Sequence, residues 1–195
     1  MINNKYSPWP SFSKEEIQSV NEVLLSNKVN YWTGNECRKF EKEFATWSDS
    51  KYAVSLANGT LALDIAFKAL GLGNGDEVIV TSRSYIASVT SIINSNATPI
   101  FVDIDKNTLN IDEKELEKKI TKKTKAILLV HVLGNTCNMD QLMKIKNKYN
   151  LILIEDTCES LGTKYKNKYL GTFGEFSSFS FYSSHQISSG EGGMI

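Results

Sequence analysis

Short apolar runs alternate with amphipathic stretches along most of the chain. The apolar runs predict strands at residues 52–56, 77–81, 98–105, 125–132, 151–156 and 177–182. Apolar residues at helical spacing lie between them and predict helices at residues 61–70, 85–93, 113–120 and 139–149. Near-continuous apolar strands that alternate with helices are typical of an α/β fold, in which helices cover both faces of a mostly parallel sheet.

The N-terminal region shows a different pattern. Ser13 and Glu16 have the spacing of a capping box, and apolar residues follow at helical intervals, so residues 11–26 are expected to form a surface helix. A second short helix is expected after it. Residues 1–50 should therefore form a helical segment that precedes an α/β domain at residues 51–195.

Composition removes several classes of function. Lys plus Arg and Asp plus Glu number 22 each, so no overall charge favours nucleic acid or an anionic membrane as a partner. No apolar run approaches the roughly 20 residues of a membrane span, and residues 1–10 lack a signal pattern, so a cytoplasmic protein is expected. The odd number of widely spaced cysteines indicates neither a disulfide framework nor a zinc site, and no metal is expected.

A small-residue turn follows the first predicted strand and leads into a helix. Gly59 and Thr60 lie at this helix start, where unpaired N–H groups and the positive end of the helix dipole can bind a phosphate. An ordinary helix cap, provided by Asn58 or Thr60, explains the same residues equally well.

Two further side chains at strand ends indicate chemistry. Asp156 directly follows the apolar run LILIE, and a buried carboxylate there needs a cationic partner that the neighbouring sequence does not supply. A protonated ring nitrogen on a cofactor is a candidate. His185 lies in a turn rich in hydroxyls and glycine after the last strand, and it can titrate near neutral pH. A polar loop with a surface histidine is the alternative interpretation.

Three other chemistries fit the sequence less well. Asp103 and Asp105 have the D-x-D spacing of metal-dependent glycosyltransferases, but that spacing is common where a strand ends in a turn. A serine hydrolase of the α/β type would need a G-x-S-x-G motif, which the chain lacks. A zinc hydrolase would need more ligands than two widely separated histidines.

Six segments occur in a defined order: NYWTG…FEKEFA, ANGTLALDIAFKALGLGNGDEVIV, FVDIDKNTLNID, TKAILLVHVLGN, EDTCESLG and FSFYSSHQISSGEGGMI. Together they resemble the DegT/DnrJ/EryC1/StrS family of pyridoxal-phosphate (PLP) enzymes that act on nucleotide sugars. The resemblance implies the large domain of the aspartate aminotransferase (type I) fold and a homodimer. It also implies a seven-stranded, mostly parallel sheet in the order 3-2-4-5-6-7-1, in which residues 194 and 195 begin an antiparallel strand between the first and sixth.

The resemblance also assigns roles to individual residues. It implies that Gly59, Thr60 and Ser180 hold the cofactor phosphate, that Tyr85 stacks on the pyridine ring, and that Asp156 pairs with the ring nitrogen. These roles agree with an anion at a helix start, an aromatic face and a buried carboxylate without a cation.

The chain departs from the sugar aminotransferases of this family at one position. Those enzymes carry there the lysine that links covalently to the cofactor, whereas this chain carries His185. Imidazole cannot make that link, but it can move a proton. The 4-keto-6-deoxy-sugar 3-dehydratases of the family have histidine at this place, and Glu159 stands where aminotransferases more often have glutamine. The resemblance therefore implies His185 and Glu159 as catalytic residues and His185 as part of the cofactor site.

Three functions remain open at this point. The first is a 3-dehydratase that uses PLP and its amine form (PMP), a nucleotide-linked keto sugar and an amino donor such as glutamate in polysaccharide or lipopolysaccharide O-antigen biosynthesis. The second is a nucleotide-sugar aminotransferase. Because the chain is shorter than the family's usual length, we also expect it to lack the rest of the large domain and a small C-terminal domain, so a non-catalytic remnant or partner subunit is the third.

Overall fold

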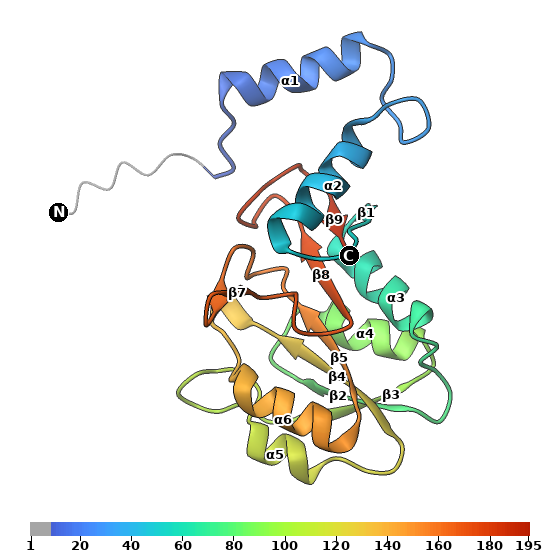
Figure 1. Ribbon diagram of the computed structural model, residues 1–195, viewed down its shortest axis with the longest axis vertical. Helices are drawn as coiled ribbons and strands as arrows, with labels where there is room; N and C mark the ends of the chain where they lie inside the picture. The colour runs from blue at the N-terminus through green and yellow to red at the C-terminus, as the bar shows by residue number, and fades with distance from the viewer. Residues whose placement is uncertain (1–8) are drawn as a thin grey trace, which may run out of the picture.

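A seven-stranded sheet lies at the centre of the computed structural model, which describes residues 9–195 (Figure 1). Its spatial order is β1-β9-β8-β5-β4-β2-β3. β9 runs antiparallel to both of its neighbours, and the other adjacent strands run parallel. The expected strand order and the expected antiparallel strand are confirmed. The strands are β1 (Ser55–Leu56), β2 (Glu77–Thr81), β3 (Thr98–Val102), β4 (Thr124–Val130), β5 (Ile152–Asp156), β8 (Phe176–Ser180) and β9 (Gly193–Met194).

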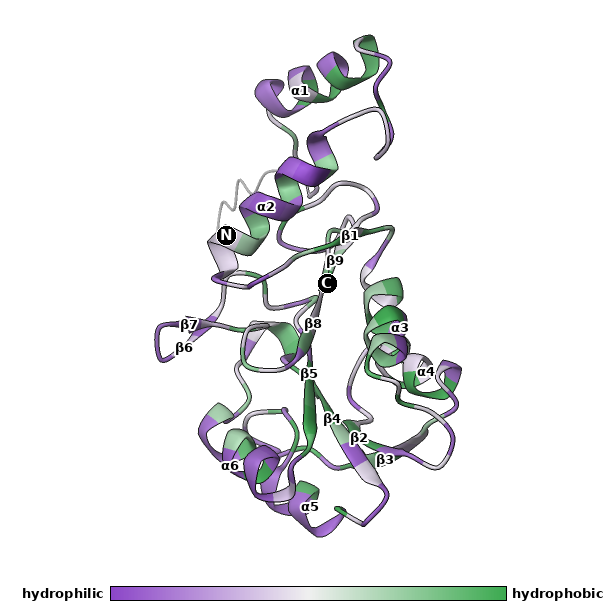
Figure 2. Ribbon diagram, turned by 45° about the vertical axis from the view of Figure 1, so that its right-hand side comes forward, coloured by the Kyte–Doolittle hydropathy of each residue, from purple (hydrophilic) through white to green (hydrophobic). Residues whose placement is uncertain are grey.

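Side-chain alternation along the central strands produces two separate cores. In β2, Ile79 points to the face covered by α5 and α6, whereas Val78 and Val80 point to the face covered by α3 and α4. Figure 2 shows these helix pairs on opposite sides of the sheet. Burial on both faces explains why these strands are apolar almost throughout. The covering helices are α3 (Gly59–Ala69), α4 (Ile86–Asn94), α5 (Glu113–Lys118) and α6 (Met139–Tyr149).

The parallel register brings the carboxyl ends of the central strands together. Val130 at the end of β4 pairs with Asp156 at the end of β5, and Asp156 pairs in turn with Ser178 of β8. Because β8 continues to Ser180, the polar residues predicted at these strand ends share one edge of the sheet.

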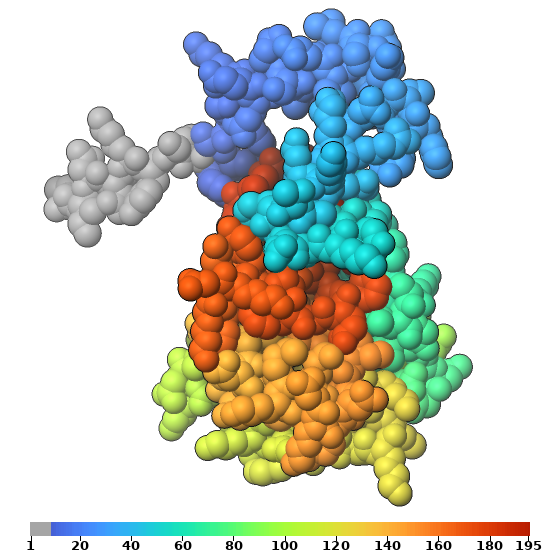
Figure 3. All heavy atoms as spheres, viewed as in Figure 1, coloured from blue at the N-terminus to red at the C-terminus, as the bar shows by residue number. Residues whose placement is uncertain are grey.

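Two N-terminal helices precede the sheet, α1 (Lys14–Leu25) and α2 (Glu36–Ser48). The predicted capping box is present, since the Ser13 and Glu16 side chains each accept the other's backbone N–H. α1 buries none of its residues and stands away from the sheet (Figure 1), and its blue atoms form one end of the molecule in Figure 3. α2 packs Phe44 against Phe179.

The proposed division of the chain into residues 1–50 and 51–195 stays a prediction, and residues 1–8 lie outside the described residues. Within the described part of the chain, no helix combines the length and the apolar character required to cross a bilayer.

Five strands are shorter than predicted: β4 ends at Val130 and β5 begins at Ile152, and the other three end or begin where the structure shows a cause. β1 covers only the end of the predicted 52–56, because its partner β9 is itself two residues long. β3 ends at Val102 because the Asp105 side chain begins a turn by accepting two backbone N–H groups. β8 ends at Ser180, after which Phe181 donates its backbone N–H to Gly192 and the chain folds back.

A small hairpin and a short helix were absent from the sequence-based expectations. The hairpin pairs β6 (Lys164–Tyr165) with β7 (Lys168–Tyr169), and its two turn residues, Lys166 and Asn167, have positive φ. Glycine and asparagine are the usual signals for such a turn, so a lysine at its first position hides it. The 3₁₀ helix η1 (Val132–Gly134) follows β4.

Candidate active site

Gly59 and Ser180 come together at the start of α3, as the predicted phosphate site requires. Gly59 is buried, and a methyl group in place of its hydrogen would lie 3.1 Å from Ser180 Cβ and 2.7 Å from Cys158 Sγ. Only glycine fits this approach without displacing a neighbour. Thr60 is the next residue of the helix and is partly buried.

The start of α3 is also an ordinary capped helix end. Asn58 Oδ1 accepts the N–H of Leu61 at 2.9 Å, which confirms the capping interpretation for Asn58. The cap leaves the first N–H groups, those of Gly59 and Thr60, without an acceptor in a preceding turn. The two interpretations are therefore compatible, because a capped helix start can still present N–H donors and a positive dipole end to an anion.

Asp156 is a buried carboxylate held by neutral donors. The residue is buried, with 7% of its surface exposed. Asp156 Oδ2 accepts the hydroxyl of Ser88 at 2.7 Å, and Oδ1 accepts the N–H of Cys158 at 3.2 Å and the hydroxyl of Ser178 at 3.4 Å. Among residues 9–195 no Lys, Arg or His forms an ion pair with it. The site therefore suits a ligand that brings its own positive charge.

Tyr85 is the N-cap of α4, with 75% of the residue exposed. Ser88, one turn further on, donates its backbone N–H to Tyr85 and its hydroxyl to Asp156. The start of α4 thus carries an exposed aromatic ring and also holds the Asp156 carboxylate through Ser88. An exposed ring of this kind can stack on a planar ligand.

His185 lies in a loop that connects β8 to β9 and is partly buried. The loop is closed at its base, because Phe181 donates its N–H to Gly192 and accepts the N–H of Ser189, both at 2.9 Å. The His185 ring packs edge-on to Tyr182 at 6.4 Å between centroids. Its described contacts are thus within its own loop, and none joins it directly to Asp156.

Glu159 links that loop to the end of β5. Its carboxylate Oε2 accepts the N–H of Leu133 at 2.7 Å, and its backbone carbonyl accepts the side-chain amide of Gln186 at 2.6 Å. Since Gln186 follows His185 in sequence, Glu159 anchors the histidine loop through its main chain and the turn after β4 through its side chain.

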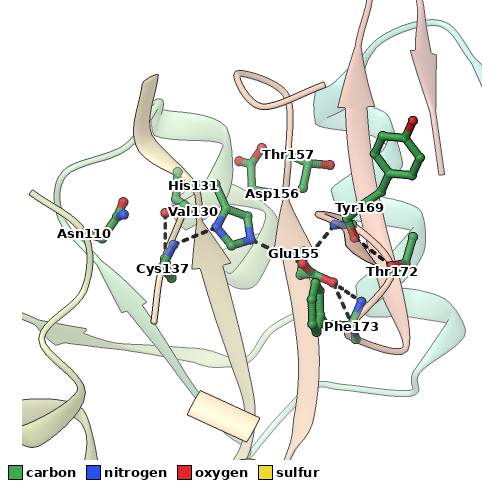
Figure 4. A network of polar contacts seen from close by, with 12 residues as sticks. Asn110, Val130, His131, Cys137, Glu155, Asp156, Thr157, Tyr169, Thr172 and Phe173 are labelled. Carbon is green, nitrogen blue, oxygen red and sulfur yellow. Dashed lines mark hydrogen bonds and ion pairs between the residues drawn. The ribbon is translucent and has the colours of Figure 1, made fainter. Parts of the chain in front are cut away.

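Sequence reasoning missed Glu155 and the role of its partner His131, both fully buried on the face opposite Asp156 (Figure 4). Glu155 accepts the N–H groups of Gly171, Phe173 and Gly174 at 2.7–2.9 Å and lies 3.2 Å from His131 Nε2. Because His131 Nδ1 accepts the N–H of Cys137, the ring hydrogen lies on Nε2 and is donated to Glu155. The sequence does contain a signal for this contact, because a second acid ends the apolar run LILIED and a loop with two glycines follows later in the chain.

The Asp103 and Asp105 side chains accept hydrogen bonds from the backbone of the turns that follow them. Asp105 Oδ1 accepts the N–H groups of Thr108 and Asn107, and these hydrogen bonds lower the pKa of the Asp105 carboxyl. Asp103 Oδ1 accepts the adjacent N–H of Ile104. In residues 9–195 no three His, Cys, Asp or Glu side chains are grouped as metal ligands. The turn that Asp105 begins after β3 therefore explains the D-x-D spacing.

Burial also governs the thiols near the site. Burial raises the pKa of Cys158, which packs beneath Gly59, and that of Cys137. Both thiols therefore stay protonated at neutral pH. Cys37, on α2, is exposed.

Comparison with known proteins agrees with this geometry. The model of the DegT/DnrJ/EryC1/StrS aminotransferase family matches residues 10–195. GDP-perosamine synthase of Escherichia coli O157:H7 is 47% identical over 193 residues, which are 98% of this chain and 53% of that protein.

Solved structures share the fold. An aminotransferase from Psychrobacter cryohalolentis superposes with a TM-score of 0.94 at 50% identity, over 97% of this chain and 48% of that one. GDP-4-keto-6-deoxymannose-3-dehydratase superposes with a TM-score of 0.89 at 36% identity, over 96% of this chain and 51% of the other. That dehydratase has been solved as a histidine-to-asparagine mutant with bound GDP-perosamine, and the E. coli enzyme with bound hydrated PLP.

The chain spans about half the length of the curated relatives it matches. The match nevertheless covers almost the whole of this chain, and the sheet order, the helix layers and the buried strand-end carboxylate all accord with it. The chain therefore belongs to the DegT/DnrJ/EryC1/StrS aminotransferase family.

Proposed function

We propose that the protein is a PLP- and PMP-dependent 3-dehydratase of nucleotide-linked 4-keto-6-deoxy sugars, in which His185 moves the proton. The observation that carries the proposal is a histidine in the loop after β8, where the family's aminotransferases have the cofactor-linking lysine. The chain has no lysine after Lys168, so this segment offers no amine to take that lysine's place.

The residues at the sheet edge fit the cofactor. Gly59, Thr60 and Ser180 would hold the phosphate, because N–H donors at the start of α3 lie against the end of β8. Tyr85 would cover one face of the ring. Asp156 would pair with the protonated ring nitrogen, which supplies the charge that its buried carboxylate lacks. When bound, the cofactor supplies an electron sink that acidifies neighbouring C–H bonds.

His185 and Glu159 would carry the proton chemistry. An imidazole can take a proton from carbon and return it to a leaving hydroxyl near neutral pH. Gln186 ties the histidine loop to the Glu159 carbonyl, so the two proposed catalytic residues are held by one local structure. One Glu159 carboxylate oxygen already accepts the N–H of Leu133, which fixes the direction of this side chain.

An aminotransferase is the second candidate. The supporting observation is that GDP-perosamine synthase and the Psychrobacter aminotransferase, at 47% and 50% identity, are more similar to this chain than the dehydratase at 36%. For either activity we propose glutamate as the amino donor and a cytoplasmic homodimer that supplies sugars for polysaccharides such as lipopolysaccharide O-antigen.

The two activities give different products from one substrate. The purified protein is incubated with PLP, glutamate and GDP-4-keto-6-deoxymannose, and the sugar products are identified by mass spectrometry. We expect loss of the C3 hydroxyl without an amino group at C4. His185→Asn should lower this rate by about 10²–10⁴-fold, the usual effect of losing a general base. Ser184→Ala, an exposed neighbour in the same loop, is the matched control and should keep the rate.

A chemical test addresses the missing lysine directly. Borohydride should leave PLP removable from the unmodified protein by dialysis, whereas His185→Lys should allow reduction to a permanent adduct that mass spectrometry detects. The dehydratase assignment fails if the unmodified protein forms an amino sugar at full turnover and His185→Asn has no effect.

A further inference from the structure

Ser88 is a fully buried hydroxyl in the first turn of α4. Its Oγ lies 2.7 Å from Asp156 Oδ2 and 2.6 Å from Ser84 Oγ. Ser84 is partly exposed and directly precedes Tyr85. The three side chains form a continuous path from the surface at Tyr85 to the buried carboxylate.

The chemistry of the groups fixes the direction of these hydrogen bonds. An ionised carboxylate can only accept, so the single hydrogen of the Ser88 hydroxyl is donated to Asp156. Ser88 must then accept the hydrogen of Ser84, whose distance of 2.6 Å is that of a good O–H···O bond. Each hydroxyl that donates polarises the next, so Ser84 strengthens the bond that Ser88 makes to Asp156.

These contacts determine which lone pairs of Asp156 remain available. Ser88 occupies Oδ2, and the N–H of Cys158 with the more distant hydroxyl of Ser178 occupies Oδ1. Donors on both oxygens fix the plane of the carboxylate, and Oδ2, which has one donor, keeps a lone pair for a further donor. Without Ser88, Oδ2 would lose its only protein donor among the described residues and the carboxylate could rotate.

We propose that Ser88, supported by Ser84, is a positioning residue that orients the Asp156 carboxylate toward the cofactor's ring nitrogen and thereby holds the proton on that nitrogen. The inference rests on the proposed function. Ser88 acts through Asp156 and does not touch the cofactor.

The experiment compares serine-to-alanine variants on the same helix. Ser88→Ala removes a donor to Asp156, whereas Ser91→Ala removes an equally buried hydroxyl that has no hydrogen-bond partner in the described structure. The purified variants are titrated with PLP labelled with ¹⁵N in the ring, and both the dissociation constant and the ¹⁵N chemical shift are measured. Neither readout needs turnover.

We expect Ser88→Ala to weaken PLP binding by about 10-fold, the effect of losing one hydrogen bond to a charged group, and to shift the ¹⁵N signal toward the unprotonated ring. Ser84→Ala should give a smaller change in the same direction, and because Ser84 is partly exposed it serves if Ser88→Ala does not fold. Ser88→Thr, which keeps the hydroxyl, should restore the ¹⁵N signal. Ser91→Ala should match the unmodified protein.

Two results would overturn the inference, and they differ. If the unmodified protein binds PLP with a protonated ring but Ser88→Ala and Ser84→Ala behave as Ser91→Ala does, Ser88 does not position Asp156 and the proposed function stands. If the unmodified protein binds no PLP, the proposed function fails and this inference fails with it.

Discussion

Replacing Glu155 with glutamine should destabilise the fold strongly although the two side chains have almost the same shape. Each Glu155 oxygen accepts two hydrogen bonds: Oε1 from Phe173 and Gly174, and Oε2 from Gly171 and His131. The glutamine amide keeps one oxygen and replaces the other with an NH₂ group. That NH₂ group would face two N–H donors, whichever way the amide is turned.

The magnitude follows from this count. Two buried donors lose a charged acceptor, and each such bond is worth about 1.5–3 kcal/mol, so the free energy of unfolding should fall by about 3–6 kcal/mol. Glu155 and His131 are both fully buried, so water cannot replace the lost acceptor. At about 2–4 °C per kcal/mol for a chain of this size, the melting temperature should fall by roughly 6 °C or more.

Glu175→Gln is the matched control. Glu175 directly follows the 171–174 loop, and its carboxylate accepts the N–H of Leu153 and pairs with Lys146, both at 2.7 Å, but its side chain is 40% exposed. Glutamine can keep the bond to Leu153 and lose only the half-exposed ion pair, worth about 0–1 kcal/mol. Urea unfolding of both variants provides the comparison. If the two substitutions lower the free energy of unfolding by the same amount, Glu155 does not act as a buried acceptor of four hydrogen bonds.

Three further predictions concern a glycine and the thiols. Gly193→Ala should lower stability by about 1–3 kcal/mol and weaken PLP binding, because its methyl would meet the Asn58 backbone and lie 2.8 Å from Gly59 N; Gly73→Ala, which meets only a carbonyl at 3.3 Å, should do neither. A thiol reagent near neutral pH should label Cys37, spare the buried Cys137, and react with the partly buried Cys158 more slowly than with Cys37. Burial raises the pKa of Cys137 and Cys158 above the ordinary thiol value of 9.0, so these thiols ionise at a lower pH in the unfolded chain than in the folded one. Their contribution to the free energy of unfolding should therefore be fully present below pH 9.0 and should fall as the pH rises above 9.0. Urea unfolding of a variant with both cysteines changed to alanine should show a smaller decline, and an equal decline would contradict this account.

The layered sheet could be predicted because its signals are local. Apolar runs at residues 77–81 and 152–156 are nearly continuous because both faces of those strands are buried. Consecutive residues therefore show the pattern without any knowledge of distant contacts. The start of α3 was likewise predictable, because Asn58, Gly59 and Thr60 are neighbours in sequence and a capped helix start needs only them.

The partners of buried polar groups required the tertiary structure. Asp156 was expected to lack a protein cation, but its donor Ser88 lies 68 residues earlier, and the same sequence pattern also fits a serine that faces solvent. Ser91, one turn further along the same helix, is equally buried, and its hydroxyl has no hydrogen-bond partner among residues 9–195.

Glu155 and Asp156 show most clearly what the sequence predicts and what only the tertiary structure decides. The run LILIED predicts a strand that ends in two acids, and the alternation of a strand places them on opposite faces. Which of them accepts the N–H groups of the 171–174 loop depends on where that loop folds back, and the Gly171 and Gly174 N–H groups reach Glu155 from 16 and 19 residues away. The sequence by itself determined the strands, their faces and the helix start, because hydrophobic periodicity acts between near neighbours. The tertiary structure alone decided which buried polar atoms meet, because a hydrogen bond depends on distance and direction between groups that the chain brings together only after it folds.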